Sequence, residues 1–189
     1  MKASLSNLST AQFEHLFTAI AQKESPMKEL IVVGFCVTDL SPALFASAVS
    51  NVKELKLSFC SEDHMLALLQ EIVENERSLT KLDLSGCCMN YIDPGLVGKA
   101  LNKLEAVTFE GCKFGWFSHD LVTATLRGVF EDESRLKQLV LNDISSSFLR
   151  GLDVELLRQA AKKIGIKTRK VVDAYQMELR RLGAISIFD

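Results

Sequence analysis

The 189-residue sequence predicts an α/β solenoid, in which one strand and one helix form a unit that must stack on its neighbours. Two observations predict this fold. A short pattern recurs along most of the chain, and it is clearest from Leu79 to Met89, where it reads L-x-x-L-x-L-x-x-C-x-φ with φ an apolar residue. A stretch with apolar residues at helical spacing follows each copy of the pattern.

Five copies of this pattern align along the chain. Their second apolar positions are 25, 27, 25 and 32 residues apart, which leaves room for a full helix in each unit. The register of the first copy stays open, because Leu30 and Val32 fit the leucine positions whereas Ile31 and Val33 would align Cys36 with the later cysteines. The copies contain Met27, Leu30 and Val32; Val52, Leu55, Leu57 and Cys60; Leu79, Leu82, Leu84 and Cys87; Leu104, Val107, Phe109 and Cys112; and Leu136, Leu139, Leu141 and Ile144.

Helix-start signals precede the helical stretches. Ser9 and Gln12 have the spacing of a capping box, so we expect a helix from there and a further strand near Leu5. Residues that favour the N-cap, some of them followed by proline or by acidic residues, mark the later starts. These starts are Ser41-Pro42, Ser61-Glu62-Asp63, Asp93-Pro94 and Ser118.

The C-terminal part departs from the pattern. Residues 154–164 predict a sixth helix that Gly165 closes as a left-handed cap, and residues 166–168 predict a last strand edge. Because an open solenoid end leaves strand edges in water, we interpret residues 169–182 as a helical cap over it. We therefore expect one domain over 1–189, with an N-terminal partial repeat and helix (1–26), repeats (27–165) and a C-terminal cap (166–189).

The central copies make the chain similar to leucine-rich repeat proteins of the ribonuclease-inhibitor type, which also form the sensor regions of NOD-like receptors. The resemblance covers roughly Leu5 to Ile164. It implies a curved, right-handed β-α superhelix with a parallel sheet on the concave face and helices on the convex face. It also implies a non-enzymatic protein-interaction module, either a small protein by itself or part of a larger receptor. Similar repeat arcs act as GTPase-activating or actin-regulatory proteins, which are the alternative functions.

In such a solenoid, the side chains that alternate with the strand leucines point into the concavity. We expect a protein partner to bind there. The alternative is a solvated face with a few stray apolar residues, and Trp116 and Phe117 could either anchor a partner from the rim or pack under their loop. The expected binding residues, which are mixed in charge and slightly acidic, are Glu29, Ile31, Glu54, Lys56, Phe59, Lys81, Asp83, Thr108, Glu110, Gln138, Asn142 and Asp143.

The composition and the charge distribution indicate which other classes of partner, such as membranes and nucleic acids, are not expected. Hydrophobic residues make up 48% and charged residues 24%, as in ordinary globular proteins. No apolar run approaches the roughly 20 residues of a membrane span, and the first residues lack a signal-peptide core, so we expect a cytoplasmic monomer without a membrane partner. The segment from Arg158 to Arg181 carries a net charge of +6, against −8 for the remainder. Because Tyr175 is its only aromatic residue, we expect no nucleic-acid partner.

The aligned cysteines are candidates for a metal or redox site. Cys60, Cys87 and Cys112, together with Cys36, occupy one position of the pattern, so they should lie about 5 Å apart along neighbouring strands. Metal sites need ligands that converge on one point, whereas this row is linear, and we therefore expect buried structural thiols. The three histidines form no i, i+4 pair and no catalytic signature is present, so we expect no enzyme activity, no cofactor and no metal.

Overall fold

Strands and helices alternate along the chain in the computed structural model, which describes residues 2–5, 9–22, 27–33, 39–75, 78–87, 89, 91–112, 118–142, 153–168, 181, 183 and 186–187. The strands are β1 (Lys2–Leu5), β2 (Glu29–Val33), β3 (Glu54–Ser58), β4 (Lys81–Ser85), β5 (Ala106–Glu110), β6 (Gln138–Asn142), β7 (Gly165–Thr168) and β8 (Ser186–Ile187). The helices are α1 (Thr10–Ala21), α2 (Pro42–Val49), α3 (Glu62–Glu74), α4 (Pro94–Asn102), α5 (Ser118–Gly128) and α7 (Val154–Lys163).

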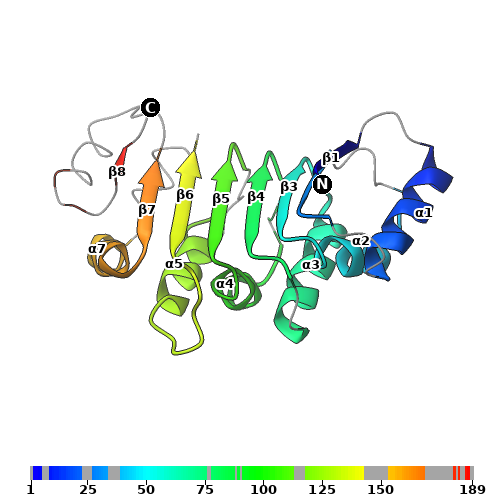
Figure 1. Ribbon diagram of the computed structural model, residues 1–189. Helices are drawn as coiled ribbons and strands as arrows, with labels where there is room; N and C mark the ends of the chain where they lie inside the picture. The colour runs from blue at the N-terminus through cyan, green and yellow to red at the C-terminus, as the bar shows by residue number, and fades with distance from the viewer. Residues whose placement is uncertain are drawn as a thin grey trace.

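The strands form one parallel sheet whose spatial order is the chain order, from β1 to β8. Figure 1 shows the helices on one side of this row of strands. Each helix therefore connects two neighbouring parallel strands, as a β-α unit requires. This architecture confirms the predicted α/β class and its alternating, stacked units.

The strand register follows the leucine positions of the sequence pattern. Leu30, Leu55, Leu82, Val107 and Leu139 lie opposite one another on β2 to β6, and all five are buried. The open question in β2 is thereby answered, since Leu30 and Val32 are fully buried while Ile31 is only partly so. A slip of one residue would have moved every side chain to the other face of the sheet.

The core lies between the sheet and the helices. One continuous cluster of buried residues runs from Phe13 to Ile166. At its N-terminal end, the rings of Phe13 and Phe17 are 6.2 Å apart, and the ring of Phe17 stacks on that of Phe45 at 6.0 Å, which joins α1 to α2. Burial of such side chains contributes roughly 1.5–3 kcal/mol each, so the helices are held on the sheet mainly by their apolar stripes.

The predicted helix caps are present where their side chains are described. Ser9 and Gln12 form the reciprocal bonds of a capping box at α1. The carboxylate of Asp93 accepts a bond of 2.7 Å from the Leu96 N–H at the start of α4. Ser41 is the exception, because its side chain forms no cap bond and Pro42 alone begins α2.

The C-terminal end differs from the prediction in two respects. Gly165 is not a left-handed cap but the first residue of β7, because its N–H donates to the Lys137 carbonyl of the neighbouring chain segment (2.7 Å) and not back to α7. The sheet also continues beyond β7 through β8, where only a cap was predicted. The predicted helix over 169–182 lies outside the described residues except for Arg181.

Candidate functional site

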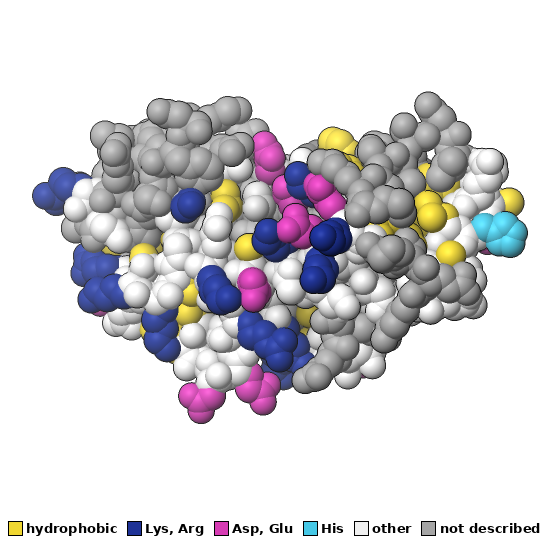
Figure 2. Space-filling view, viewed as in Figure 1, with side chains coloured by type: hydrophobic (Ala, Val, Ile, Leu, Met, Phe, Trp, Pro, Cys, Tyr) yellow, Lys and Arg dark blue, Asp and Glu magenta, His cyan; other side chains and the backbone are white. Residues whose placement is uncertain are grey.

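The face of the sheet opposite the helices, called here the open face, holds most of the predicted binding residues. Along β3, β4 and β5, buried side chains alternate with exposed or half-buried ones. Lys56, Lys81 and Glu110 are exposed, and their neighbours on this face are half-buried. Figure 2 shows Lys, Arg, Asp and Glu side chains gathered over the middle strands. The alternation predicted from sequence is confirmed there.

A shallow depression of about 280 Å³ lies in the middle of the open face. Its small residues, Ala106 and Thr108 on β5, leave a gap between longer side chains on the neighbouring strands. The structure therefore brings side chains from four successive strands to one place. The other side chains that line it on this face are Glu54, Lys56, Lys81, Asp83 and Gln138.

Ion pairs between neighbouring strands organise the charges of the open face. Glu54 lies directly opposite Lys81, with 2.6 Å between the carboxylate and the ammonium group, and Glu29 pairs with Lys56 at 3.4 Å. The hydrogen bond that Lys81 donates to Glu54, and then the negative charge of Glu54, raise the pKa of Lys81, so its ammonium group stays charged at neutral pH. Both lysines are exposed to water and Glu29 is half-buried, and such pairs near the surface contribute little to folding stability. Their effect is to hold charged groups in place beside the depression.

Phe59 occupies an unusual backbone conformation at the carboxyl end of β3. Its φ is +55°, and the equivalent positions after β4 and β5 are Gly86 (φ +61°) and Gly111 (φ +55°). The Phe59 ring lies against Gly86, since a Cβ at Gly86 would come within 2.6 Å of the ring. A bulky residue at positive φ costs about 1–3 kcal/mol, yet this side chain is 52% exposed. The chain thus keeps an accessible aromatic ring where a glycine would fit more easily.

Tyr91 is a second exposed aromatic residue that sequence reasoning missed. It lies in the connection between β4 and α4, it is 86% exposed, and its N–H donates to the Glu62 carboxylate at 2.7 Å. The strand and helix patterns assign no face to this connection. One feature of the sequence could have indicated its exposure. Tyr91 is a large aromatic residue that belongs neither to the alternating pattern of a strand nor to the apolar stripe of a helix, and it lies two positions before the Asp93 cap.

Not every predicted binding residue is accessible. The register places Asn142 on the open face opposite Glu110, but its side chain is only 4% exposed, so its prediction as a contact residue is wrong. Val140 on the same strand is buried as well, and Ile31 is half-buried. Strand alternation determines the face of a residue but not what lies over that face. Asp143, Trp116 and Phe117 lie outside the described residues.

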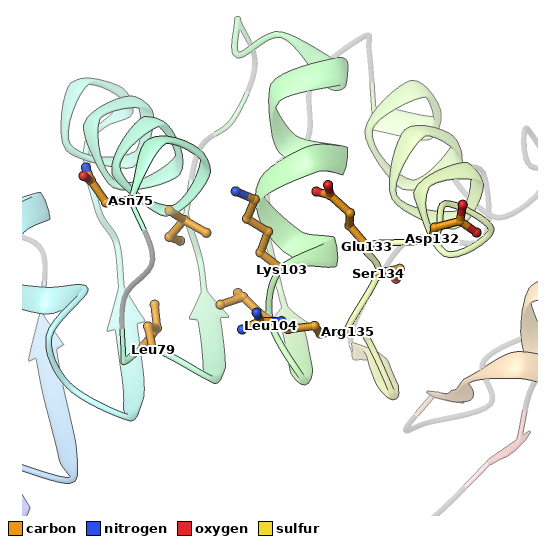
Figure 3. A pocket seen from close by; sticks show the side chains of 9 residues that line it. Asn75, Leu79, Lys103, Leu104, Asp132, Glu133, Ser134 and Arg135 are labelled. Carbon is orange, nitrogen blue, oxygen red and sulfur yellow. The ribbon is translucent and has the colours of Figure 1, made fainter.

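A larger pocket of about 410 Å³ lies at the amino ends of the strands (Figure 3). Its buried apolar residues are Ile72, Leu79 and Leu104, and charged groups of both signs surround them. The Lys103 side chain crosses to the neighbouring helix, where its ammonium group donates to the Val73 carbonyl near the C-terminus of α3 (2.7 Å). Such a bond to a helix carbonyl is ordinary capping chemistry. We therefore interpret this pocket as a gap between packed units.

The cysteines have structural contacts. Cys60 and Cys87 are buried as predicted, whereas Cys112 is only half-buried. The Cys112 thiol contacts the Leu84 carbonyl of the preceding strand (3.3 Å), and the Cys87 thiol contacts the Leu57 carbonyl (3.6 Å). Burial raises the pKa of Cys112 to about 12 and that of Cys60 further still, with the neighbouring Cys87 as a smaller cause. The thiols of Cys60 and Cys112 therefore stay protonated, and those of Cys87 and Cys112 each tie a turn to the strand before it. Cys36 lies outside the described residues.

We expect stability to fall as the pH rises from about 9 to about 12. The folded thiol of Cys112 keeps its proton up to about pH 12, while the unfolded thiol loses it near pH 9.0, so the folded state binds more protons across this window. The check is the urea midpoint as a function of pH. The Cys112→Ala variant serves as the control, because its midpoint should fall less steeply than that of the wild type. Parallel curves would contradict this role of the thiol.

No protein-family model matches this chain, and no curated protein matches it in sequence. Within the described ranges, no group of three or more His, Cys, Asp or Glu side chains is placed to hold a metal ion. None of the helices that the structure describes is both long enough and apolar enough to cross a membrane. The function is therefore inferred from the geometry of the open face.

Proposed function

We propose that this chain is a leucine-rich repeat interaction module of the ribonuclease-inhibitor type, which binds a protein partner on the concave face of its superhelix. The open face is that concave face. The parallel sheet, the repeated leucine register and one helix per unit support this assignment. The chain acts by binding and not by catalysis.

The observation that carries the proposal is the depression around Thr108. Parallel sheets are usually covered on both faces, whereas here β3, β4 and β5 keep exposed and half-buried side chains away from the helices. Side chains from four strands border the depression, so one inserted group of a partner would contact several units at once. Charged groups held by ion pairs surround small, neutral residues, and protein interfaces likewise combine an apolar centre with a polar rim.

The test is a pair of matched substitutions combined with crosslinking. A photoreactive amino acid at Gln138 should capture the partner from cells that express the chain, and its affinity for the purified chain is then measured. Thr108→Arg fills the depression with a long cation and should weaken that affinity by about a hundredfold or more. Thr123→Arg makes the same change on α5, on the opposite side of the sheet, and should leave the affinity unchanged.

Charge reversals give a second arm of this test. Reversals at Glu54, Asp83 and Glu110 should weaken binding together, because the three belong to successive strands of one face. Reversal at Glu74, which is exposed on α3, should have almost no effect. If Thr123→Arg or the Glu74 reversal controls binding instead, the open face is not the site. The captured protein also separates the alternatives, since a GTPase or actin as the dominant partner would favour a regulatory role.

A further inference from the structure

The turns at the carboxyl ends of β3, β4 and β5 form a distinct surface, called here the carboxyl rim. Its described residues are 59–63, 85–87, 89, 91–93 and 110–112. They include the two most exposed large apolar side chains that the structure describes, Phe59 and Tyr91. The rim therefore presents aromatic surface on two consecutive units.

Backbone and side-chain contacts bring the parts of the rim together. The Phe59 N–H donates to the Ser85 carbonyl (2.9 Å), and its ring lies against Gly86. The Gly86 N–H in turn donates to the Glu110 carbonyl (2.9 Å). On the helix side, the bond from the Tyr91 N–H to Glu62 ties Tyr91 to the start of α3. Phe59, Tyr91 and the intervening turn thus belong to one continuous region and not to separate loops.

The charged residues that the structure describes in the carboxyl rim have one sign. Its described residues include four carboxylates and no lysine or arginine, and the carboxylates belong to Glu62, Asp63, Asp93 and Glu110. Two of them already have partners, because Glu62 accepts from Tyr91 and Asp93 caps α4. Asp63 and Glu110 are exposed, and neither forms an ion pair with another residue of the described ranges.

At the amino ends of β2 to β6, basic residues outnumber acidic ones, although Thr80 precedes β4 and Glu105 precedes β5. The residues that immediately precede β2, β3 and β6 are Lys28, Lys53 and Lys137, all exposed. A charged partner lying along the strands therefore meets an acidic, aromatic end and a more basic end. Electrostatic complementarity of this kind mainly sets orientation and specificity.

We propose that the carboxyl rim binds a segment of the partner that carries lysine or arginine side chains beside an apolar one. The cations contact Asp63 and Glu110 and lie over the rings of Phe59 and Tyr91, and the apolar side chain packs against the Phe59 ring. Aromatic faces attract cations within about 6 Å of the ring centre, so the same rings serve both kinds of side chain. This inference rests on the proposed function, since it specifies how a partner on the open face is recognised.

The conformation of Phe59 supports this assignment and supplies a clean test of it. Glycine adopts the φ of +55° without strain, and glycine occupies the two equivalent turns. Phe59→Gly should therefore fold at least as well as the wild type, so that a loss of binding cannot be attributed to unfolding. A purely structural role for the ring would instead lower the urea midpoint of this variant.

The experiment measures fluorescence anisotropy of two short labelled peptides with the full chain. One peptide contains lysines interspersed with leucines, and the other has glutamate in place of every lysine. The lysine peptide should bind the chain and the glutamate peptide should not, with an affinity that falls as salt is added. Phe59→Gly should weaken binding by about tenfold or more, and Asp63→Asn and Glu110→Gln each by about threefold. Glu74→Gln on α3 is the matched control and should change nothing.

Three results would overturn the inference: no binding of the lysine peptide, equal binding of both peptides, or unchanged binding by Phe59→Gly. The results for Thr108→Arg and Phe59→Gly distinguish failure of this inference from failure of the proposed function. If the crosslinked partner depends on Thr108 but not on Phe59, the open face remains the binding site and the rim inference is wrong. If Phe59→Gly abolishes binding of the lysine peptide while Thr108→Arg leaves the partner's affinity unchanged, the rim is a binding surface and the open-face proposal is wrong.

Discussion

Leu84→Ala should lower the free energy of unfolding by about 3–5 kcal/mol, one of the two largest effects expected for a single substitution in this chain. Leu84 is fully buried in the middle of β4, among side chains from the neighbouring strands and the helices. Truncation removes buried apolar surface and leaves a cavity that the surrounding repeats can fill only in part. Since domains are typically stable by only 5–15 kcal/mol, the variant should lie close to its unfolding threshold.

The control for this prediction is the adjacent residue on the other face of the same strand. Asp83→Ala should change the free energy of unfolding by less than about 1 kcal/mol, because Asp83 is only half-buried and lies on the open face. Urea unfolding followed by circular dichroism measures both variants, and similar slopes would show that only stability has changed. Similar midpoints for Leu84→Ala and the wild type would contradict the assigned faces of β4.

Gly98→Ala should lower the free energy of unfolding by about 2–3 kcal/mol, although alanine is the better helix former by about 1 kcal/mol. A Cβ at Gly98 would come within 2.9 Å of the backbone carbon and oxygen of Ala124 on α5. Backbone atoms cannot rotate away as a side chain does, so α4 and α5 would have to move apart. The nearby amide of buried Asn102 also bridges the two helices, with bonds to the Gly98 carbonyl (2.8 Å) and the Thr125 carbonyl (2.9 Å).

Gly95→Ala on the same helix is the matched control. A Cβ there would meet mainly the end of the Asp93 side chain, at 3.0 Å, and that side chain can adjust. We expect no change or a gain of up to about 1 kcal/mol, since glycine is a poor helix former. A comparison of the two thermal midpoints separates helix propensity from helix packing. If both substitutions stabilise the chain, the packing of α4 against α5 does not require glycine at position 98.

Stability and binding are expected to oppose each other at the carboxyl rim. Phe59 holds an exposed ring at a backbone conformation that favours glycine, and Gly86 leaves the space that the ring occupies. A substitution at Gly86 would therefore strain the backbone and displace the ring together. Residues that serve binding commonly carry such a local cost, and the rest of the fold must offset it.

Much of the fold could be predicted because it depends on local patterns. The alternation of Leu82, Asp83 and Leu84 predicts which side chains of β4 are buried, and the repetition of the pattern in successive units predicts which strands pair. The caps at Ser9 and Asp93 likewise involve groups a few residues apart. The candidate site was predicted in outline for the same reason, since strand alternation alone places Lys56, Lys81 and Thr108 on one face.

The sequence by itself therefore determined the repeat unit, the strand register from β3 to β6 and the buried face, because side chains within one strand or one helix turn decide them, whereas the register of β2 was decided only by the structure. Only the tertiary structure decided where the open face is hollowed and which of its residues are accessible. The depression at Thr108 and the contact of Phe59 with Gly86 join residues from different strands, and the burial of Asn142 depends on what lies over its face. Gly165 enters a strand for a similar reason, since its N–H bonds to a carbonyl 28 residues earlier in the chain, at Lys137. Such contacts form between residues that are distant in sequence, and no local pattern specifies them.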